Sequence, residues 1–84
     1  MALLTIGAFA RASRLTSKTL RFYDEVGVLR PAAVDPDTAY RLYDPDQIPQ
    51  ARLIARLRGI GMPLAEIRTV CAMEPADAAA AVAA

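Results

Sequence analysis

Residues 16–26 constrain the fold of this chain more than any other stretch, because their polar and apolar side chains recur at the period of an α-helix. Plotted at about 100° per residue, one arc of this helix holds the polar side chains Ser17, Lys18, Arg21, Asp24 and Glu25. The opposite arc holds Thr19, Leu20, Phe22, Tyr23 and Val26. We therefore predict a helix that packs by its apolar side and exposes Lys18 and Arg21, which suit contact with a phosphate or a base edge. The alternative is a solvated polar face without a partner, which is common for amphipathic helices.

A shorter helix is predicted just before this one. Thr5 is suited to cap it, and Phe9 lies on its apolar side. Residues 13–15 then make a short connection, and Thr16 caps the longer helix. Gly27 ends that helix, because glycine adopts a left-handed conformation without a Cβ penalty. Two short helices joined in this way form a helix-turn-helix arrangement.

The chain next changes to an extended pattern. Two short runs, at residues 32–34 and 40–43, flank a turn-rich segment. In the second run, Leu42 is predicted to point inward, with Arg41 and Tyr43 on the other face. A two-stranded hairpin is unstable alone, so we expect it to lean on the helices as a wing.

A second pair of helices is predicted after the hairpin. Asp44 is a good N-cap, with a proline at the first helical position and Gln47 three residues after the cap. Pro49 removes one early hydrogen bond, so a bent or 3₁₀ first turn is expected. The apolar stripe of this helix is predicted to consist of Leu53, Ile54, Leu57 and Ile60. Arg52 and Arg56 lie outside the stripe and are interpreted as part of a solvated face.

Charge is unevenly distributed along a chain whose formal net charge is only +1. Residues 11–21 contain Arg11, Arg14, Lys18 and Arg21 but no acid. Such local basic charge is typical of a nucleic-acid footprint. The 84 residues suit one small domain that is marginally stable alone or helped by a partner.

Composition argues against several classes of protein. No apolar run approaches the roughly 20 residues needed to span a bilayer, and no secretory signal is evident, so we expect a cytoplasmic protein without a membrane segment. The chain has no His, and Cys71 is its only cysteine, which leaves no Cys/His zinc site, internal disulfide or Cys–His catalytic pair within one chain. We expect no enzymatic activity and no cofactor. Cys71 is interpreted as a small core residue, the alternative being a redox or metal role shared across a dimer.

Four motifs resemble those of a known family when taken together and in order. They are Leu4-Thr5-Ile6-Gly7, Leu15-Thr16-Ser17-Lys18-Thr19-Leu20-Arg21-Phe22-Tyr23-Asp24-Glu25-Val26-Gly27-Val28-Leu29, Tyr40-Arg41-Leu42-Tyr43 and Leu57-Arg58-Gly59-Ile60-Gly61-Met62. Over roughly residues 4–73, the chain resembles the DNA-binding domain of the MerR family of bacterial transcription regulators. The resemblance implies a mainly α-helical fold, with a winged helix-turn-helix, a second helix pair and a long helix that forms an antiparallel coiled coil with a second subunit.

The resemblance also implies a function and its residues. Members of the family bind pseudo-palindromic promoter operators as dimers, and they distort the spacer so that RNA polymerase can use both promoter elements. The DNA-binding residues carried over to this sequence are Ser17, Lys18, Arg21, Tyr23, Tyr40, Arg41 and Arg58. Lys18 and Arg21 would reach into the major groove, and Tyr23 would donate to a phosphate. Tyr40 and Arg41 would contact the backbone from the wing, whereas Arg58 would clamp a phosphate from the third helix.

The sequence departs from the family pattern in three places. Ala39 stands where a glycine is usual, so the wing turn must avoid a positive φ or accept strain. Ala8 replaces a common glutamate. The dimerisation helix is incomplete, because residues 74–84 are mostly alanine and offer almost no large apolar side chain. We predict a winged helix-turn-helix domain over residues 1–73, followed by the start of a dimerisation or linker helix over 74–84.

Two other functions remain open from the sequence. One is an architectural factor of the phage excisionase type, which bends DNA without contacting polymerase. The other is a protein-interaction module whose alanine-rich tail packs on a partner helix.

Overall fold

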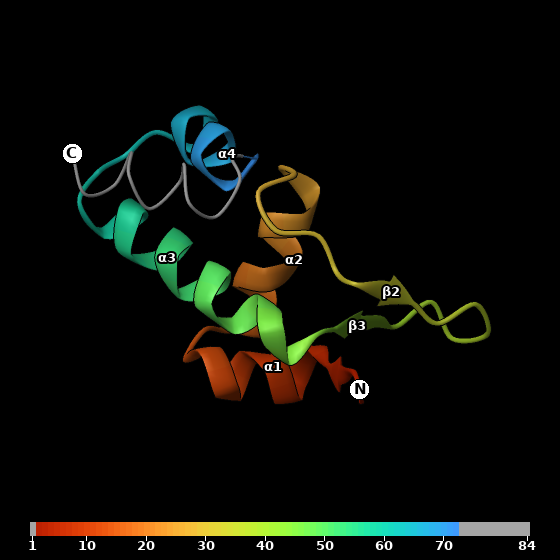
Figure 1. Ribbon diagram of the computed structural model, residues 1–84. Helices are drawn as coiled ribbons and strands as arrows, with labels where there is room; N and C mark the ends of the chain where they lie inside the picture. The colour runs from red at the N-terminus through yellow and green to blue at the C-terminus, as the bar shows by residue number, and fades with distance from the viewer. Residues whose placement is uncertain (1, 73–84) are drawn as a thin grey trace.

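The computed structural model describes residues 2–72. The elements follow one another in the order β1 (Leu4–Thr5), α1 (Ile6–Ser13), α2 (Ser17–Glu25), β2 (Ala33–Val34), β3 (Arg41–Tyr43), a 3₁₀ turn (Pro45–Gln47), α3 (Ile48–Gly59) and α4 (Leu64–Ala72). The helices gather on one side, and the hairpin of β2 and β3 projects away from them (Figure 1). This arrangement confirms the predicted winged helix-turn-helix with a second helix pair. The predicted helix at residues 74–84 lies outside the described part of the chain.

The first two helices begin where their capping residues predict. The Thr5 hydroxyl accepts a hydrogen bond from the backbone N–H of Ala8 at 3.2 Å, and the Thr16 hydroxyl accepts one from Thr19 at 3.0 Å. Between the helices, Arg14 adopts a left-handed conformation with φ of 60°. The chain therefore reverses over three residues, and α1 packs against both α2 and α3.

The carboxyl end of α2 is fixed from two directions. Gly27 follows it with φ of 77°, the left-handed geometry predicted for a glycine at this position. From α4, an NH₂ group of Arg68 donates to the carbonyl oxygen of Val26 at 2.6 Å. A cation is favourable there, because the carbonyl end of a helix carries partial negative charge. The second helix pair thus holds the end of α2 in place.

The third helix also starts as predicted. The Asp44 carboxylate accepts from the backbone N–H of Asp46 at 2.8 Å, and the side chain of Gln47 accepts from the backbone of Asp44 at 2.8 Å. The 3₁₀ turn that follows this cap accommodates Pro49 at the start of α3. The amide of Gln47 also donates to the carbonyl oxygen of Arg30 at 2.7 Å, which joins this turn to the segment after α2.

The sheet has three strands and not the two predicted. Its order is β1-β3-β2, with both pairs antiparallel. Leu42 at its centre pairs with Thr5 on one side and Ala33 on the other. A two-residue strand such as β1 is too short to show the alternation that identifies strands in a sequence. The N-terminal segment therefore braces the base of the wing.

The predicted orientation of β3 was wrong. Tyr43 is completely buried, and its ring stacks on that of Phe9 with the centroids 4.5 Å apart, whereas Leu42 is only partly buried. Arg41 does share a face with Tyr43, as alternation requires, but this face turns toward the helices. The aromatic ring buries more apolar area than a leucine, and this gain favours the arrangement in which the Tyr43 face of β3 turns inward.

The core consists of side chains from the four α-helices, from the segment that follows α2, and from β3. Its buried apolar residues are Phe9, Ala10, Leu20, Tyr23, Val28, Leu29, Tyr43, Ala51, Ile54, Leu57 and Ile67. Two residues predicted to be apolar-side residues are exposed: Phe22 at 38% and Ile60 at 78%. Ile60 lies beyond the last residue of α3, so the helical stripe no longer applies to it. None of the helices within residues 2–72 has the length and apolar character needed to cross a bilayer.

Cys71 is partly buried and packs against the core, as predicted for a small apolar residue. Burial raises the pKa of its thiol, and a hydrogen bond with the Gln50 side chain lowers it by less. The thiol therefore stays protonated and weakly nucleophilic near neutral pH.

The wing turn is strained at Ala39. Ala39 has φ of 62°, so it takes the positive φ that glycine would take without a Cβ penalty. Because the left-handed conformation costs a residue with a Cβ about 1–2 kcal/mol, we expect Ala39→Gly to raise the free energy of unfolding by up to about 1 kcal/mol after the entropic cost of glycine. Urea denaturation measures this change. A loss of stability would show that the surrounding turn, and not φ, controls this position.

Candidate nucleic-acid interface

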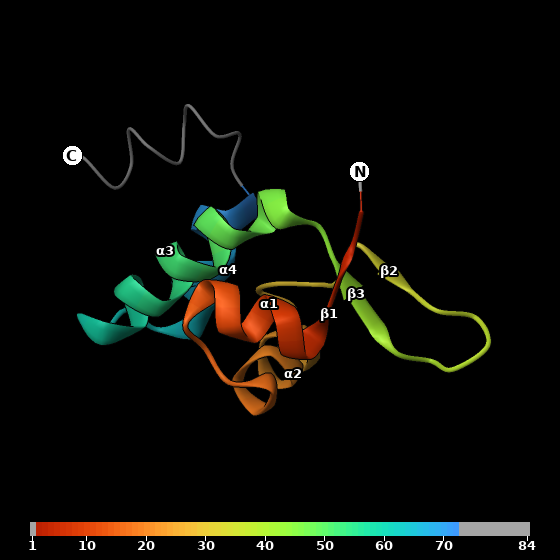
Figure 2. The ribbon, with the colours of Figure 1, turned by 90° about the horizontal axis from the view of Figure 1, so that it is seen from below.

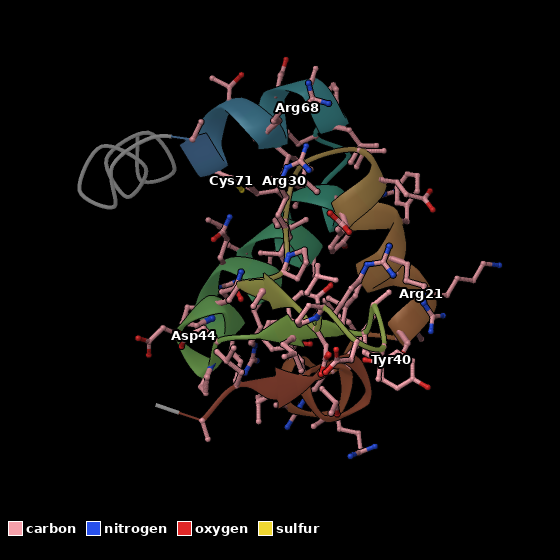
Figure 3. The ribbon with its side chains drawn as sticks, turned by 90° about the vertical axis from the view of Figure 1, so that its right-hand side faces the viewer. Arg21, Arg30, Tyr40, Asp44, Arg68 and Cys71 are labelled. Atoms are coloured by element: carbon pink, nitrogen blue, oxygen red, sulfur yellow. The ribbon has the colours of Figure 1, made fainter. Side chains whose placement is uncertain are left out.

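Helix α2 presents its basic side chains to solvent. Lys18 and Arg21 are exposed, as predicted, and Ser17 is half-buried at the first turn. Figure 3 places Arg21 on the same side of the molecule as Tyr40 of the wing, with Asp44 on the opposite side. The structure thus brings the helix and the wing residue to one face.

A hollow of about 510 Å³ lies between α2 and α3, and we call it the α2–α3 hollow. Its lining consists of Leu15, Lys18, Thr19, Phe22, Tyr23 and Arg58. Two of these side chains are cationic and none is acidic. Within residues 2–72, no carboxylate lies within ion-pair distance of Lys18, Arg21 or Arg58. This combination of cations and hydroxyl groups suits an anion such as a backbone phosphate.

Tyr23 contributes a phenol to this hollow from a ring that belongs to the core. Only 3% of the residue is exposed, because its ring packs among the core side chains. Burial raises the pKa of Tyr23, and the nearby charge of Arg58 lowers it by less. The phenol therefore remains protonated at neutral pH and keeps the proton that it would donate to a phosphate.

Phe22 has a role that its sequence pattern did not indicate. The guanidinium carbon of Arg58 lies 5.6 Å from the centroid of the Phe22 ring, in a cation–π arrangement. The ring is partly exposed because it supports this arginine rather than filling the core. The contact aligns a residue of α3 with one of α2, and helical periodicity within a single segment cannot reveal it.

The tip of the wing is ordered by Asp35. Its carboxylate accepts from the backbone N–H of Asp37 at 2.8 Å and of Thr38 at 3.3 Å, and its carbonyl accepts from Ala39 at 2.8 Å. Tyr40, immediately after this turn, is 70% exposed. Most of the Tyr40 side chain is therefore accessible to solvent or to a partner.

Arg41 is held by the helix and is less exposed than Tyr40. Its Nε donates to the Asp24 carboxylate at 2.9 Å, and this hydrogen bond is the main reason that its pKa is raised. Arg30 approaches the same carboxylate at 4.0 Å. Asp24 therefore joins the wing to the last turn of α2, a function missed in the sequence because its partner is seventeen residues away.

We expect Asp24→Asn to loosen this connection. The substitution removes the charge that attracts Arg41, so the free energy of unfolding should fall by about 1 kcal/mol, a value discounted because both side chains keep some contact with water. Arg30→Ala is the matched control, because its side chain is 74% exposed and its contact is longer. Urea denaturation compares them. Equal effects of the two substitutions would contradict the special role of the Asp24–Arg41 pair.

Comparisons with known proteins agree with this geometry. Residues 4–74 match the family described as MerR HTH family regulatory protein. The transcriptional regulator BrlR of Pseudomonas aeruginosa is 45% identical over 65 residues, which are 77% of this chain and 24% of that protein. The multidrug-efflux transporter 1 regulator of Bacillus subtilis is 41% identical over 64 residues, 76% of this chain and 23% of that protein. The chain thus spans about a quarter of the length of these relatives.

Two solved structures are also similar. One is EcmrR in a cryo-EM structure of the EcmrR–DNA complex in EcmrR-RPo, with a TM-score of 0.76 and 40% identity over 82% of this chain and 26% of the other. The second is HiNmlR, a MerR family regulator lacking the sensor domain and bound to promoter DNA, with a TM-score of 0.73 and 26% identity over 83% of this chain and 52% of the other. The chain therefore belongs to the MerR family of helix-turn-helix regulatory proteins.

Proposed function

We propose that this chain is the DNA-binding domain of a MerR-type transcription regulator and binds double-stranded DNA in a sequence-specific way. The observation that carries the proposal is the α2–α3 hollow, whose lining includes Lys18, Tyr23 and Arg58 and no acidic side chain. Helix α2 enters the major groove, where Lys18 and Arg21 reach base edges and Ser17 contacts the backbone at the first turn. Tyr23 and Arg58 bind a phosphate beside it.

The wing contacts the backbone on the other side of the recognition helix. Tyr40 supplies an exposed side chain, and Asp24 holds the guanidinium of Arg41 beside the last turn of α2. Phosphate contacts fix the position of a protein along the duplex, while base contacts specify the sequence. Tyr40 and Arg41 therefore set where α2 lies in the groove and do not set its sequence preference.

The wider assembly is proposed from the relatives. The EcmrR and HiNmlR structures contain DNA, in one case promoter DNA. By analogy, the chain forms a homodimer through a helix that the sequence predicts to begin within residues 74–84, binds a pseudo-palindromic promoter operator and distorts its spacer for RNA polymerase. It acts in the cytoplasm by binding and not by catalysis. The family match favours this role over an excisionase-type factor or a protein-interaction module.

The salt dependence of binding tests the proposal. A duplex selected by the unaltered chain from a random pool should bind with an affinity that falls steeply as salt rises, because bound arginine and lysine side chains release counterions. Arg58→Ala should weaken the selected and random duplexes alike and reduce the slope of log affinity against log salt by about 1. Fluorescence anisotropy over a salt series measures both. Salt-independent binding, or none, by the unaltered chain would refute the proposed function.

A further inference from the structure

A second basic hollow, separate from the proposed DNA contacts, lies between α3 and the end of α1. This α1–α3 hollow has a volume of about 610 Å³. Its lining consists of Ser13, Arg14, Leu15, Ile48, Pro49, Arg52, Ala55 and Arg56. Three lining residues are arginines and none is acidic, so the hollow has the electrostatic character of an anion site. Its apolar floor comes from residues that pack near the core.

The three arginines carry unbalanced charge. Arg52 and Arg56 are exposed one turn apart on α3, where like charges repel by about 0.2–0.5 kcal/mol. Arg14 lies at the corner between α1 and α2 and has a left-handed backbone conformation. Within residues 2–72, no carboxylate lies within ion-pair distance of any of them. The helix dipole favours Arg56 in the last turn but not Arg52 near the middle, so helix stability alone does not explain the cluster.

This hollow meets the α2–α3 hollow at one shared lining residue, Leu15. Leu15 lines both hollows, with Arg14 before it on one side and Lys18 after it on the other. Figure 2 shows the connection between α1 and α2 alongside α3, the helix that supplies Arg58 to one hollow and Arg56 to the other. The basic side chains therefore form a track around the corner that precedes α2.

We propose that Arg14, Arg52 and Arg56 bind backbone phosphates of the same DNA duplex, outside the stretch that α2 and Arg58 engage. This inference rests on the proposed function. The guanidinium groups extend the footprint along the flank of the half-site. They add affinity and salt dependence but no base preference, because phosphates carry no sequence information.

Two duplexes and two double variants test this inference. One duplex ends at the edge of the selected half-site, and the other is extended by about one helical turn, about 10 base pairs, on each side. Arg52→Ser/Arg56→Ser removes two charges from the hollow. Arg11→Ser/Arg30→Ser removes two exposed charges outside both hollows and is the charge-matched control. Because Arg30 shares the Asp24 carboxylate with Arg41, the gain from extending the duplex is measured for each variant relative to its own binding to the short duplex. Circular dichroism establishes that both variants are folded.

The unaltered chain should bind the extended duplex more tightly than the short one. Arg52→Ser/Arg56→Ser should lose this gain and reduce the salt slope on the extended duplex by about 2, with little change on the short duplex. The inference is overturned if Arg52→Ser/Arg56→Ser still binds the extended duplex more tightly than the short one, or if the control variant loses this difference equally. It is also overturned if the substitutions change transcription but not DNA affinity, because the hollow would then be assigned to a protein partner. Absence of salt-sensitive binding by the unaltered chain refutes the proposed function instead.

Discussion

Replacing Phe9 by alanine is expected to remove about 3–5 kcal/mol from the free energy of unfolding. The side chain is completely buried and stacks on Tyr43, so its loss leaves a cavity where α1 meets the sheet. Cores of domains below about 70–80 residues rarely supply more than about 3–5 kcal/mol, and this chain is only slightly longer. Most molecules of the variant should therefore be unfolded at 25 °C. Far-ultraviolet circular dichroism and urea denaturation measure the effect.

Tyr43→Phe is the control for this prediction. It keeps the stacked ring but removes a buried hydroxyl that makes no hydrogen bond in the structure. Leaving such a group unpaired costs about 1–3 kcal/mol, so this variant should be as stable as the unaltered chain or more stable. A clear loss of stability in Tyr43→Phe would show that the hydroxyl has a hydrogen-bond partner in solution. If Phe9→Ala were as stable as the unaltered chain, the stack of Phe9 on Tyr43 would not be central to the core.

Arg21→Ala is expected to relax base preference while leaving the fold intact. Arg21 is exposed on α2 and lies within no ion pair among residues 2–72, so its removal should not change the urea midpoint. A side chain that reads a base edge contributes about 1–3 kcal/mol of discrimination. Affinity for the selected duplex should fall by that amount, and affinity for a random duplex should fall much less. Competition binding with both duplexes measures the difference.

Arg58→Ala provides the comparison, because a phosphate contact should weaken both duplexes alike. If Arg21→Ala also weakened both equally, Arg21 would be a backbone contact and another residue of α2 would carry the base reading. Lys18→Ala, tested in the same way, would then identify whether its neighbour on the exposed arc has that role.

Local signals predicted much of this fold. Thr5, Thr16 and Asp44 cap the helices as expected, because a capping hydrogen bond joins residues two or three apart and depends only on nearby sequence. Gly27 ends α2 for the same local reason. The family assignment followed from motifs that the structure places on the helix, the wing and the end of α3.

Interactions between distant segments were not predicted. The stack of Phe9 on Tyr43 reversed the expected face of β3, and the Asp24–Arg41 pair depends on how the wing meets α2. Arg58 over Phe22 likewise joins two helices. Amphipathic periodicity gives the face that a segment buries but not the partner that it meets. The DNA contacts assigned to individual residues stay predictions, since they depend on a second molecule.

The position of β1 next to β3 has a consequence for how the chain folds during synthesis. Thr5 and Leu4 pair with Leu42 and Tyr43, so the first strand has no hydrogen-bonding partner until the second half of the wing has left the ribosome. Helices α1 and α2 are translated earlier, so the ring of Phe9 stays unpacked until Tyr43 has been synthesised and can stack on it. Tertiary packing of α1 therefore begins only when β3 and α3 have emerged, and a nascent chain stalled before that point leaves the Phe9 ring without its cover.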